Sequence, residues 1–479
     1  MKKYMIILVL ISALASSCKD YLDLKPKNQI VLGTLKDARL MMSSYLFALT
    51  AQDALPVTFN GKRITWPFNR DAMANFSFYS DDILMAAAMS SSYTRKYEPE
   101  YYEDGNWQGK SFANTMWLSL YTHIGYLNEV ITGADKTKDE DPKMYEMVKG
   151  EALTARAFFI FKLLQLYAPY QNNELGIPLN FDTQMIKGGK RLSQKDVYKQ
   201  IIDDLNLAMD YSKQNASWNI FMHKNIIHAL LAQVYMFKAE SAAKEADDWK
   251  NVQMNSGVIV DEYQLETTVE QIRTQFTSVA PGAIKNNPHA LLILVWNTTP
   301  RSNFYSLWGT SGNNNGLTPS TELNELYTAD DIRNSAYFDA NGMFNKYSFS
   351  FSAADFATMF RVADLYLINA EANIRLNDGR GKQVLEAFIK NRTGQQISVP
   401  TAELLSTLLK ERKKELCVEY ESRWVDMKRL GLSITRKSTD SKTNQLTDYT
   451  LIAHDYRYAL PIPVESELSY NNITQNPGW

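Results

Sequence analysis

Long stretches in which apolar residues recur every three or four positions limit this chain to a mainly helical fold. The clearest is 144–167, where Ala152, Phe159 and Leu163 fall on one helical face. It stops before Pro169, a residue that cannot continue a helix. Five further stretches have the same period and predict helices at about 196–212, 224–242, 359–376, 381–393 and 402–430.

Small residues stand where such helices would cross one another, for example Ala229 and Ala232 in one stretch and Ala363 and Ala370 in another. A short turn, NDGRG at 377–381, joins two of the stretches. Helices of this length, paired through short turns, look like degenerate repeats of the tetratricopeptide kind. The repeat signature alone does not define the architecture.

The start of the chain predicts an export signal. Two lysines precede an apolar run at 4–14, which is too short to span a bilayer, since a helical span needs about 20 residues. Small residues then lead to Cys18, the position that lipoprotein processing acylates. We therefore expect residues 1–17 to be a signal peptide and Cys18 to carry a lipid. Lipoprotein signals usually have Leu where this chain has Ala15, so secretion without a lipid is the alternative.

Composition and charge argue against a nucleic-acid partner. Without the two lysines of the signal, 49 of the 51 Lys and Arg residues remain against 53 Asp and Glu, a formal charge of −4. Phosphate contacts need a basic footprint, which this balance does not provide. No long apolar run recurs after the signal, so membrane contact is expected through the lipid or a partner. Cys417 is the other cysteine, which we interpret as a buried helical thiol without a disulfide.

Two long irregular regions separate the predicted helices and contain many aromatic residues. The first, 52–109, places Trp66, Trp107 and several tyrosines among polar residues. The second, 297–319, follows a strand-like apolar run at 289–296. Long loops inside a compact domain are usually functional or disordered, and the aromatic content argues against disorder. Both regions are therefore candidate binding surfaces.

The sequence lacks the residue patterns of common catalytic and metal sites. None of the five histidines has metal-ligand spacing to another, and His223 and His228 fall on different helix faces. The segment 377–383 fails the phosphate-loop pattern, and no GxSxG occurs. Adjacent carboxylates do not make the separated pair of a glycosidase. We interpret these carboxylates as helix N-caps: Asp81, Asp82, Asp330 and Asp331.

Seven short segments occur in the order found in the SusD/RagB family of surface lipoproteins. The mature N-terminus resembles the family's cysteine, Leu-Asp and Pro opening, and the C-terminus resembles its Gln-Asn-Pro-Gly-aromatic ending. Between them lie a Ser-Asp-acidic element and four helices that are similar to the family's motif helices, so the resemblance extends over nearly the whole chain. The segments are CKDYLDLKPKNQ (18–29), YSDD (79–82), WLSLYTHIGYLNEVI (117–131), EALTARAFFIFKLLQLYA (151–168), RVADLYLINAEANIRLN (361–377), LKERKKELCVEYESRWVDMKRLG (409–431) and LPIPVESELSYNNITQNPGW (460–479).

The resemblance implies a SusD-like fold: mainly α, with tetratricopeptide-like helix pairs, minor β elements and long ligand-binding loops, in a single domain at 18–479. It implies a lipid-anchored protein at the surface of the outer membrane that binds an oligosaccharide or polysaccharide and passes it to a SusC-like TonB-dependent transporter. It implies no enzyme and no cofactor, and it leaves open whether a structural calcium ion is bound. The residues read as helix-packing and ion-pair residues are Arg423, Trp424, Asp426 and Arg429.

The segment YYEDGNW at 101–107 resembles a recurrent Trp-x-Asp-Gly-Gly-x-Trp element of the family's sugar site, with tyrosine at the first aromatic position. A sugar stacks its C–H face on an aromatic ring, and a contact of about 50 Å² is worth about 1 kcal/mol. Millimolar binding needs about 4 kcal/mol, so several rings and polar groups must converge. The candidate ligand-binding residues are Trp66, Tyr101, Tyr102, Asn106, Trp107, Asn303, Tyr305 and Trp308.

The leading hypothesis is a glycan-binding lipoprotein without enzymatic activity. The alternative is a peptide-binding lipoprotein that serves a TonB-dependent peptide transporter, since part of the family resembles such proteins. A peptide would favour a long groove with backbone hydrogen bonds, whereas a glycan favours exposed flat rings. A hydrolase is the weakest hypothesis because the sequence shows no acid–base or nucleophile constellation.

Overall fold

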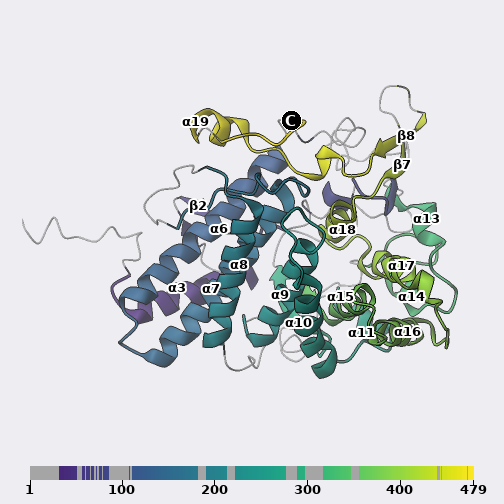
Figure 1. Cartoon of the computed structure of the whole chain (residues 1–479), viewed down its shortest axis with the longest axis horizontal. Coiled ribbons are helices and arrows are strands. Elements are labelled where there is room, and N and C mark those ends of the chain that lie inside the picture. The colour runs from purple at the N-terminus through teal and green to yellow at the C-terminus, as the bar shows by residue number, and fades with distance from the viewer. Residues whose placement is uncertain are drawn as a thin grey trace, which may run out of the picture.

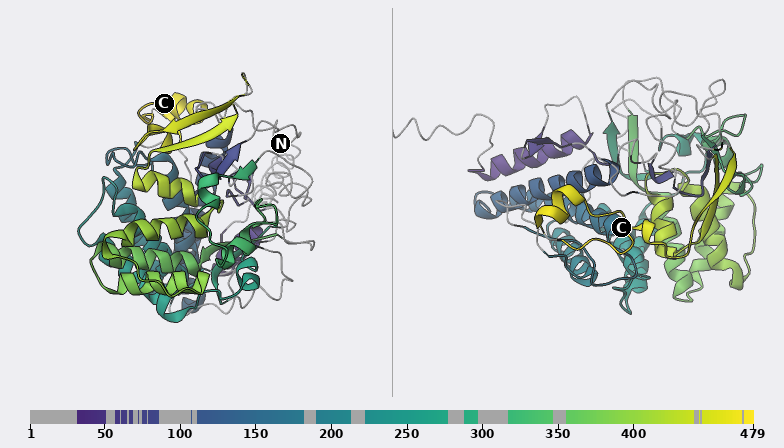
Figure 2. Two further views of the ribbon diagram at one scale, coloured as in Figure 1. Left: turned by 90° about the vertical axis from the view of Figure 1, so that its right-hand side faces the viewer. Right: turned by 90° about the horizontal axis from the view of Figure 1, so that it is seen from above.

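The chain folds into a body of helices with short strands along one side (Figures 1 and 2). This agrees with the predicted fold class, mainly α with minor β elements. The computed structural model describes residues 32–50, 57–85 with short gaps, 107, 111–181, 190–212, 222–276, 288–296, 317–346, 355–439 and 443–479 without 444 and 472.

The principal helices are α3 (Leu35–Thr50), α6 (Ser111–Lys136), α7 (Pro142–Tyr167), α8 (Gln194–Tyr211), α9 (Lys224–Lys238), α10 (Asp248–Glu262), α15 (Val362–Arg375), α16 (Arg380–Thr393), α17 (Leu404–Leu416) and α18 (Ser422–Leu430). α3 packs on α6, α6 on α7 and α7 on α8. α9 packs on α10, α10 on α15, and α15 on both α16 and α17. Figure 1 shows these pairs following one another from the purple to the green part of the chain. Consecutive helices therefore pair, as the repeat-like pattern predicts.

The bounds of α7 follow from local chemistry. Asp141 accepts hydrogen bonds from the backbone N–H groups of Lys143 and Met144, each at 3.1 Å, and Pro142 occupies the first helical position. The helix ends just before Pro169. The prediction for 144–167 is thus confirmed, and those for 196–212, 224–242 and 381–393 are confirmed with small shifts of their ends.

The turn between α15 and α16 needs a glycine at one position. A Cβ atom on Gly381 would lie 2.7 Å from the backbone nitrogen of Ile374. Such a contact is not tolerated, so only glycine lets the two helices approach this closely. The short turn predicted at 377–381 is confirmed, with Asn377 in the left-handed region at φ 56°.

The helix predicted at 402–430 is wrong because two helices occupy the segment. α17 ends at Leu416 and α18 begins at Ser422. Between them Val418 and Tyr420 have φ values of 51° and 47°, a conformation that costs energy for any residue with a Cβ atom and most for a β-branched one. Cys417 lies in this break, and its thiol is buried as expected.

In the described part of the chain the strands form three small sheets. β1 (Thr58–Phe59) pairs with β2 (Lys62–Arg63), and β4 (Ala290–Trp296) pairs antiparallel with β6 (Asp355–Arg361). The strand predicted at 289–296 is thereby confirmed, whereas the start of the helix predicted at 359–376 is wrong, since β6 precedes α15. The largest sheet has the order β5-β3-β7-β8, from β3 (Ile83–Met85), β5 (Leu317–Pro319), β7 (Ile434–Thr439) and β8 (Leu446–Leu451).

The described chain also contains short helical elements: α11 (Val269–Arg273), α13 (Thr321–Asn324), α14 (Ile332–Tyr337), η3 (Thr401–Glu403), η4 (Tyr456–Tyr458), η5 (Val464–Leu468) and α19 (Ser469–Asn471). The C-terminal segment crosses the top of the helices in Figure 1. Asn476 donates to the carbonyl of Tyr167 at 2.7 Å, and Trp117 donates to the carboxylate of Glu467 at 3.1 Å. These bonds attach the end of the chain to α6 and α7.

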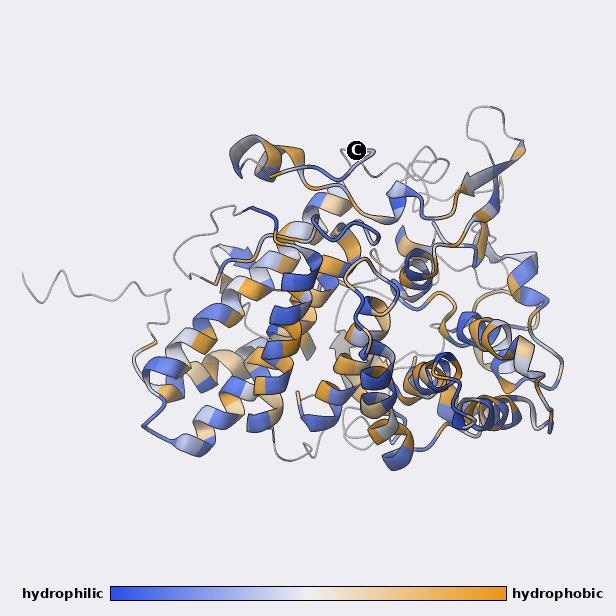
Figure 3. Cartoon of the chain, viewed as in Figure 1, coloured by the Kyte–Doolittle hydropathy of each residue, from blue (hydrophilic) through white to orange (hydrophobic). Residues whose placement is uncertain are grey.

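The interior combines an extended apolar core with many buried charges. In Figure 3, apolar and polar positions alternate along the helices, so each helix contributes an apolar stripe to the inside. One group of buried ion pairs, which we call the arginine cluster, contains Arg333, Lys346, Arg361, Arg392, Lys414, Glu266, Asp331, Glu411, Glu415 and Glu419. No helix within the described ranges is long and apolar enough to cross a membrane.

Candidate ligand site

The two aromatic regions of the sequence are attached to neighbouring strands. β3 ends at Met85 and β5 begins at Leu317, and these two residues face each other across an antiparallel pair. Residues 86–106 follow β3 in the chain, and residues 297–316 precede β5. The chain therefore leaves β3 toward the first aromatic segment at the same edge where it arrives at β5 from the second. This edge of the sheet is the candidate ligand site.

A hairpin brings polar side chains to the same edge. β7 runs parallel to β3 and pairs Ser438 with Met85, so the turn between β7 and β8 follows at that edge. On the exposed face, the ammonium of Lys437 lies 2.9 Å from the carboxylate of Asp448, and the hydroxyls of Thr435 and Thr450 lie 2.9 Å apart. Such donors and acceptors suit the hydroxyls of a sugar. Sequence reasoning missed this hairpin, although its alternating polar residues on both sides of a turn-rich segment could have indicated it.

The ends of β3 and β5 are clamped to the helices by the YSDD segment. Asp82 accepts a hydrogen bond from the backbone N–H of Val418 at 3.0 Å, inside the break between α17 and α18. The backbone carbonyl of Asp82 accepts from the N–H of Ser320 at 2.9 Å, directly after β5. These contacts hold the strained break and both strands in one place.

Asp81 anchors the same turn through charge. Its carboxylate accepts from Arg423 at 2.6 and 2.7 Å and from Lys413 at 2.8 Å. Burial alone would raise the pKa of Asp81, but the two cations outweigh it and lower the pKa below its ordinary value. The N-cap interpretation of Asp81 and Asp82 is wrong, since the residues precede a strand. It is confirmed for Asp331, which caps α14 by accepting from the N–H of Arg333.

Two of the predicted ligand-binding residues lie in the core. Trp107 has 0% of its surface exposed and contacts Tyr79 with ring centroids 4.2 Å apart. Trp66 is 3% exposed and stacks on Phe158 at 5.6 Å. Neither indole has a face open to a ligand in this structure, so the prediction that these two rings stack on a sugar is corrected. Their large apolar surface is used in packing instead.

The other predicted site residues fall outside the described part of the chain. They are Cys18, Tyr101, Tyr102, Asn106, Asn303, Tyr305 and Trp308.

The predicted structural role of the motif helix is confirmed. Arg429 forms two hydrogen bonds of 2.8 Å with Glu371 on α15 and one of 2.7 Å with Asp426. Arg423 pairs with Asp81, and the ring of Trp424 packs 5.1 Å from that of Tyr458. All of these side chains hold α18 against its neighbours.

The His, Cys, Asp and Glu residues of the described ranges do not form a metal site. No set of three or more His, Cys, Asp or Glu residues there has the geometry of a metal site. Burial raises the pKa of the Cys417 thiol to about 11, which disfavours the reactive thiolate. His228 lies 2.9 Å from the side chain of Asn255, and His223 lies 3.3 Å from the carbonyl of Leu291.

Matches to two protein-family models cover most of the chain. Residues 272–479 match the model of the SusD family, and residues 20–236 match a SusD-like model described as starch-binding and associating with the outer membrane. The chain belongs to the SusD/RagB family. A search of curated proteins gave no match.

Crystal structures of SusD-like proteins share the fold. A protein of Bacteroides vulgatus superposes with a TM-score of 0.71 at 20% identity, covering 94% of this chain and all of its own. A SusD superfamily protein of Bacteroides thetaiotaomicron gives 0.68 at 20% identity, covering 93% and 100%. A SusD-like carbohydrate-binding protein of Bacteroides vulgatus gives 0.67 at 19% identity, covering 92% and 97%.

Proposed function

We propose that this SusD-family protein is a lipid-anchored, non-enzymatic glycan-binding protein of the outer-membrane surface, which captures an oligosaccharide or polysaccharide and passes it to a TonB-dependent transporter. The observation that carries the proposal is the family match over both halves of the chain, one half to a model described as starch-binding and outer-membrane-associating. A structural neighbour is described as carbohydrate-binding.

The strand pairing supports the proposed location of the glycan site at the sheet edge. Because β3, β5 and β7 deliver three chain segments to one sheet edge, aromatic and polar groups from distant parts of the sequence can converge there. Stacked rings worth about 1 kcal/mol each need such convergence to reach useful affinity. The rigid helices and the clamp at Asp81 and Asp82 supply the platform.

A binding screen tests the function. The full-length chain in detergent is titrated with starch oligosaccharides, other neutral and acidic glycans, and peptides, and new reducing ends are measured in parallel. We expect glycan binding at micromolar to millimolar Kd without the release of reducing ends. Binding of peptides alone would establish the alternative, a peptide-binding lipoprotein. Cleavage that a single Asp or Glu substitution abolishes would overturn the non-enzymatic proposal.

Trp308→Ala should lower glycan affinity by about 1 to 2 kcal/mol, which is about five- to thirtyfold, because one stacking ring is lost. The melting temperature should change little. Calorimetric titration beside melting curves measures both. The matched control is Trp249→Ala on α10, whose indole donates to Glu240 at 3.1 Å and should affect stability but not affinity. The reverse pattern would place Trp308 in the packing.

Cys18→Ala should release the protein from the membrane while leaving it folded, because the proposed anchor is the lipid on that cysteine. Fractionation of cells that lack the partner transporter measures this directly. A Ser17→Ala variant, which keeps the cysteine and a small residue before it, is the control and should stay in the membrane fraction. Membrane retention of Cys18→Ala in those cells would show that the anchor lies elsewhere.

A further inference from the structure

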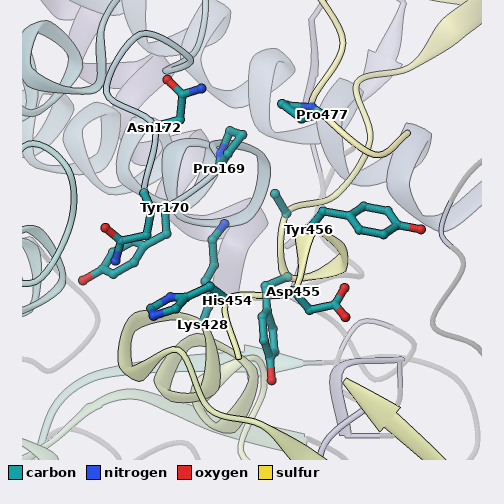
Figure 4. A pocket seen from close by; sticks show the side chains of 11 residues that line it. Pro169, Tyr170, Asn172, Lys428, His454, Asp455, Tyr456 and Pro477 are labelled. Carbon is teal, nitrogen blue, oxygen red and sulfur yellow. The ribbon is translucent and has the colours of Figure 1, made fainter. Parts of the chain in front are cut away.

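A separate pocket lies between the turn after α7, helix α18 and the C-terminal segment (Figure 4). Its volume is about 210 Å³, which is below the roughly 300 to 1,000 Å³ of drug-sized sites and suits a group of about the size of one sugar. It shares no residue with the candidate ligand site. Its lining includes Tyr170, Asn172, Lys428, His454, Asp455 and Tyr456.

The floor of the pocket holds a buried cation without a counter-ion. Lys428 is 2% exposed, and its ammonium donates to the backbone carbonyl of Gln165 at 2.7 Å. It forms no ion pair with any residue in the described ranges. Figure 4 shows its side chain extending from α18 into the space between Pro169, Tyr170 and Tyr456. Its remaining N–H groups are therefore available to a ligand in the pocket.

A second unbalanced cation lies close by. Arg191 donates to the carbonyls of Gly176 at 2.8 Å and Thr474 at 3.0 Å, and to the amide oxygen of Asn476 at 2.8 Å. These acceptors are all neutral, and no carboxylate of the described chain pairs with it. Burial lowers the pKa of Lys428 to about 7, and the charge of Arg191 adds to this effect. Two cations that pair with no carboxylate of the described chain therefore lie near this pocket.

Several other buried cations of the described chain are paired with carboxylates. Lys238 lies 2.8 Å from Asp248, Lys162 lies 2.6 Å from Glu421, and Arg156 lies 2.8 Å from Asp204. A buried charge is costly unless an opposite charge compensates it. An anionic ligand that reaches an uncompensated lysine in a pocket is therefore expected to bind with an unusually favourable free energy.

The carboxylate of Asp455, which also lines the pocket, does not act as a counter-ion for Lys428. Asp455 accepts from the guanidinium of Arg457 at 2.7 and 2.8 Å and from the backbone N–H of Ile452 at 3.3 Å. In Figure 4 its carboxylate points away from Lys428. The carboxylate of Asp455 is thus already paired with Arg457.

The rim of the pocket is aromatic. Tyr456 is 47% exposed, and its ring packs edge-on against Trp479 with centroids 5.0 Å apart. An exposed ring that a second ring holds in place can stack on the C–H face of a sugar. Tyr456 therefore lies at the mouth of the pocket, with its ring extending away from Lys428 in Figure 4, and the positive charge lies at the floor.

We propose that this pocket binds a uronic acid residue, with its carboxylate on Lys428 and its ring toward the mouth of the pocket, where Tyr456 lies. The proposal rests on the proposed glycan-binding function and extends it to an acidic sugar at a second subsite. Asn172 and His454 line the same pocket and carry polar groups of the kind that bind sugar hydroxyls.

Titration of the full-length chain in detergent with sodium D-glucuronate, D-glucose and sodium acetate tests the proposal. Glucuronate should bind at least tenfold more tightly than glucose, which lacks the carboxylate, and than acetate, which lacks the ring. Lys428→Met should weaken glucuronate binding at least tenfold, and Tyr456→Ala about fivefold. Lys199→Met, an exposed lysine on α8, is the matched control and should change nothing.

The pH profile gives a readout that does not depend on a variant folding. The titratable groups that line the pocket with Lys428 are His454, Asp455 and the tyrosines Tyr170, Tyr456 and Tyr458, and the charge of Arg191 also acts on Lys428. Because Lys428 loses its proton near pH 7, glucuronate affinity of the wild type should fall up to tenfold from pH 7.5 to pH 8.5. The same fall should persist in His454→Gln, which separates the lysine from the imidazole.

The failures of the two proposals are distinguishable. Equal affinity for glucuronate and glucose, no glucuronate binding, or a flat pH profile would overturn the uronate subsite. If neutral glycans still bind, the proposed function stands without it. Absence of binding to every glycan in the screen would overturn the proposed function itself.

Discussion

Glu415→Gln should lower the free energy of unfolding by about 3 to 5 kcal/mol, the cost of removing one charge from a buried ion-pair network. The carboxylate of Glu415 accepts from Arg392 at 3.1 Å, from Arg333 at 3.3 Å and from Arg361. The arginine cluster balances five cations with five carboxylates, so the variant leaves one positive charge uncompensated in the interior. Urea unfolding followed by circular dichroism measures the change.

The exposed pair between Lys199 and Asp203 supplies the control. Asp203→Asn removes one charge at the surface and should cost less than about 0.5 kcal/mol, since exposed pairs contribute little. A Glu415→Gln variant as stable as this control would show that the cluster does not hold the helices together.

The pH dependence of stability should change with the same substitution. Burial opposes the charge of Glu415, but Arg392, Arg361 and Arg333 lower its pKa well below the ordinary value. A lowered carboxyl pKa contributes stability that is present above the unfolded pKa, near 4.5, and is lost as the pH falls through the folded value. The wild type should therefore lose more stability than Glu415→Gln between pH 5 and pH 2.

Trp107→Ala should lower the free energy of unfolding by about 3 to 5 kcal/mol, because a fully buried indole leaves a large cavity when it is truncated. The ring lies among Tyr79, Phe112 and Trp424, with centroids 4.2, 5.6 and 5.9 Å away. Thermal and urea unfolding measure the loss. This result is the opposite of the one expected for a residue that stacks on a ligand.

Trp107→Phe separates packing from binding. It keeps an aromatic ring in the core and should recover more than half of the stability lost in Trp107→Ala. Its glycan affinity should equal that of the wild type, because the ring does not reach a ligand. A stable Trp107→Ala protein with weakened glycan binding would restore the original assignment of this residue to the sugar site.

Predictions from the sequence were most accurate where structure depends on neighbouring residues. The start and end of α7 follow from a cap at Asp141, a proline at its first position and a proline after its end. The prediction was wrong where a contact between residues distant in the sequence determines where a helix ends. The apolar period continues through 402–430, but Asp82, over 300 positions away, binds the backbone at Val418 where the helix breaks.

The aromatic residues show the same difference between what neighbouring residues determine and what distant contacts determine. The sequence indicated two aromatic regions but not which of their rings are buried, since Trp66 and Trp107 stand among polar residues and still enter the core. The convergence of the two regions depends on the pairing of Met85 with Leu317. Pairing between residues so far apart carries no local signal in one sequence.

The sequence by itself determined the helical class, the positions of most helices, the buried thiol and, through its seven segments, the family. Each of these depends on the period of apolar residues, on local caps and turns, or on short motifs. Only the tertiary structure decided which charges lack an ion-pair partner in the described chain, as at Lys428, and which strands lead to the two aromatic segments. Ion pairing and strand pairing are set by distances in space, and a linear order of residues does not contain those distances.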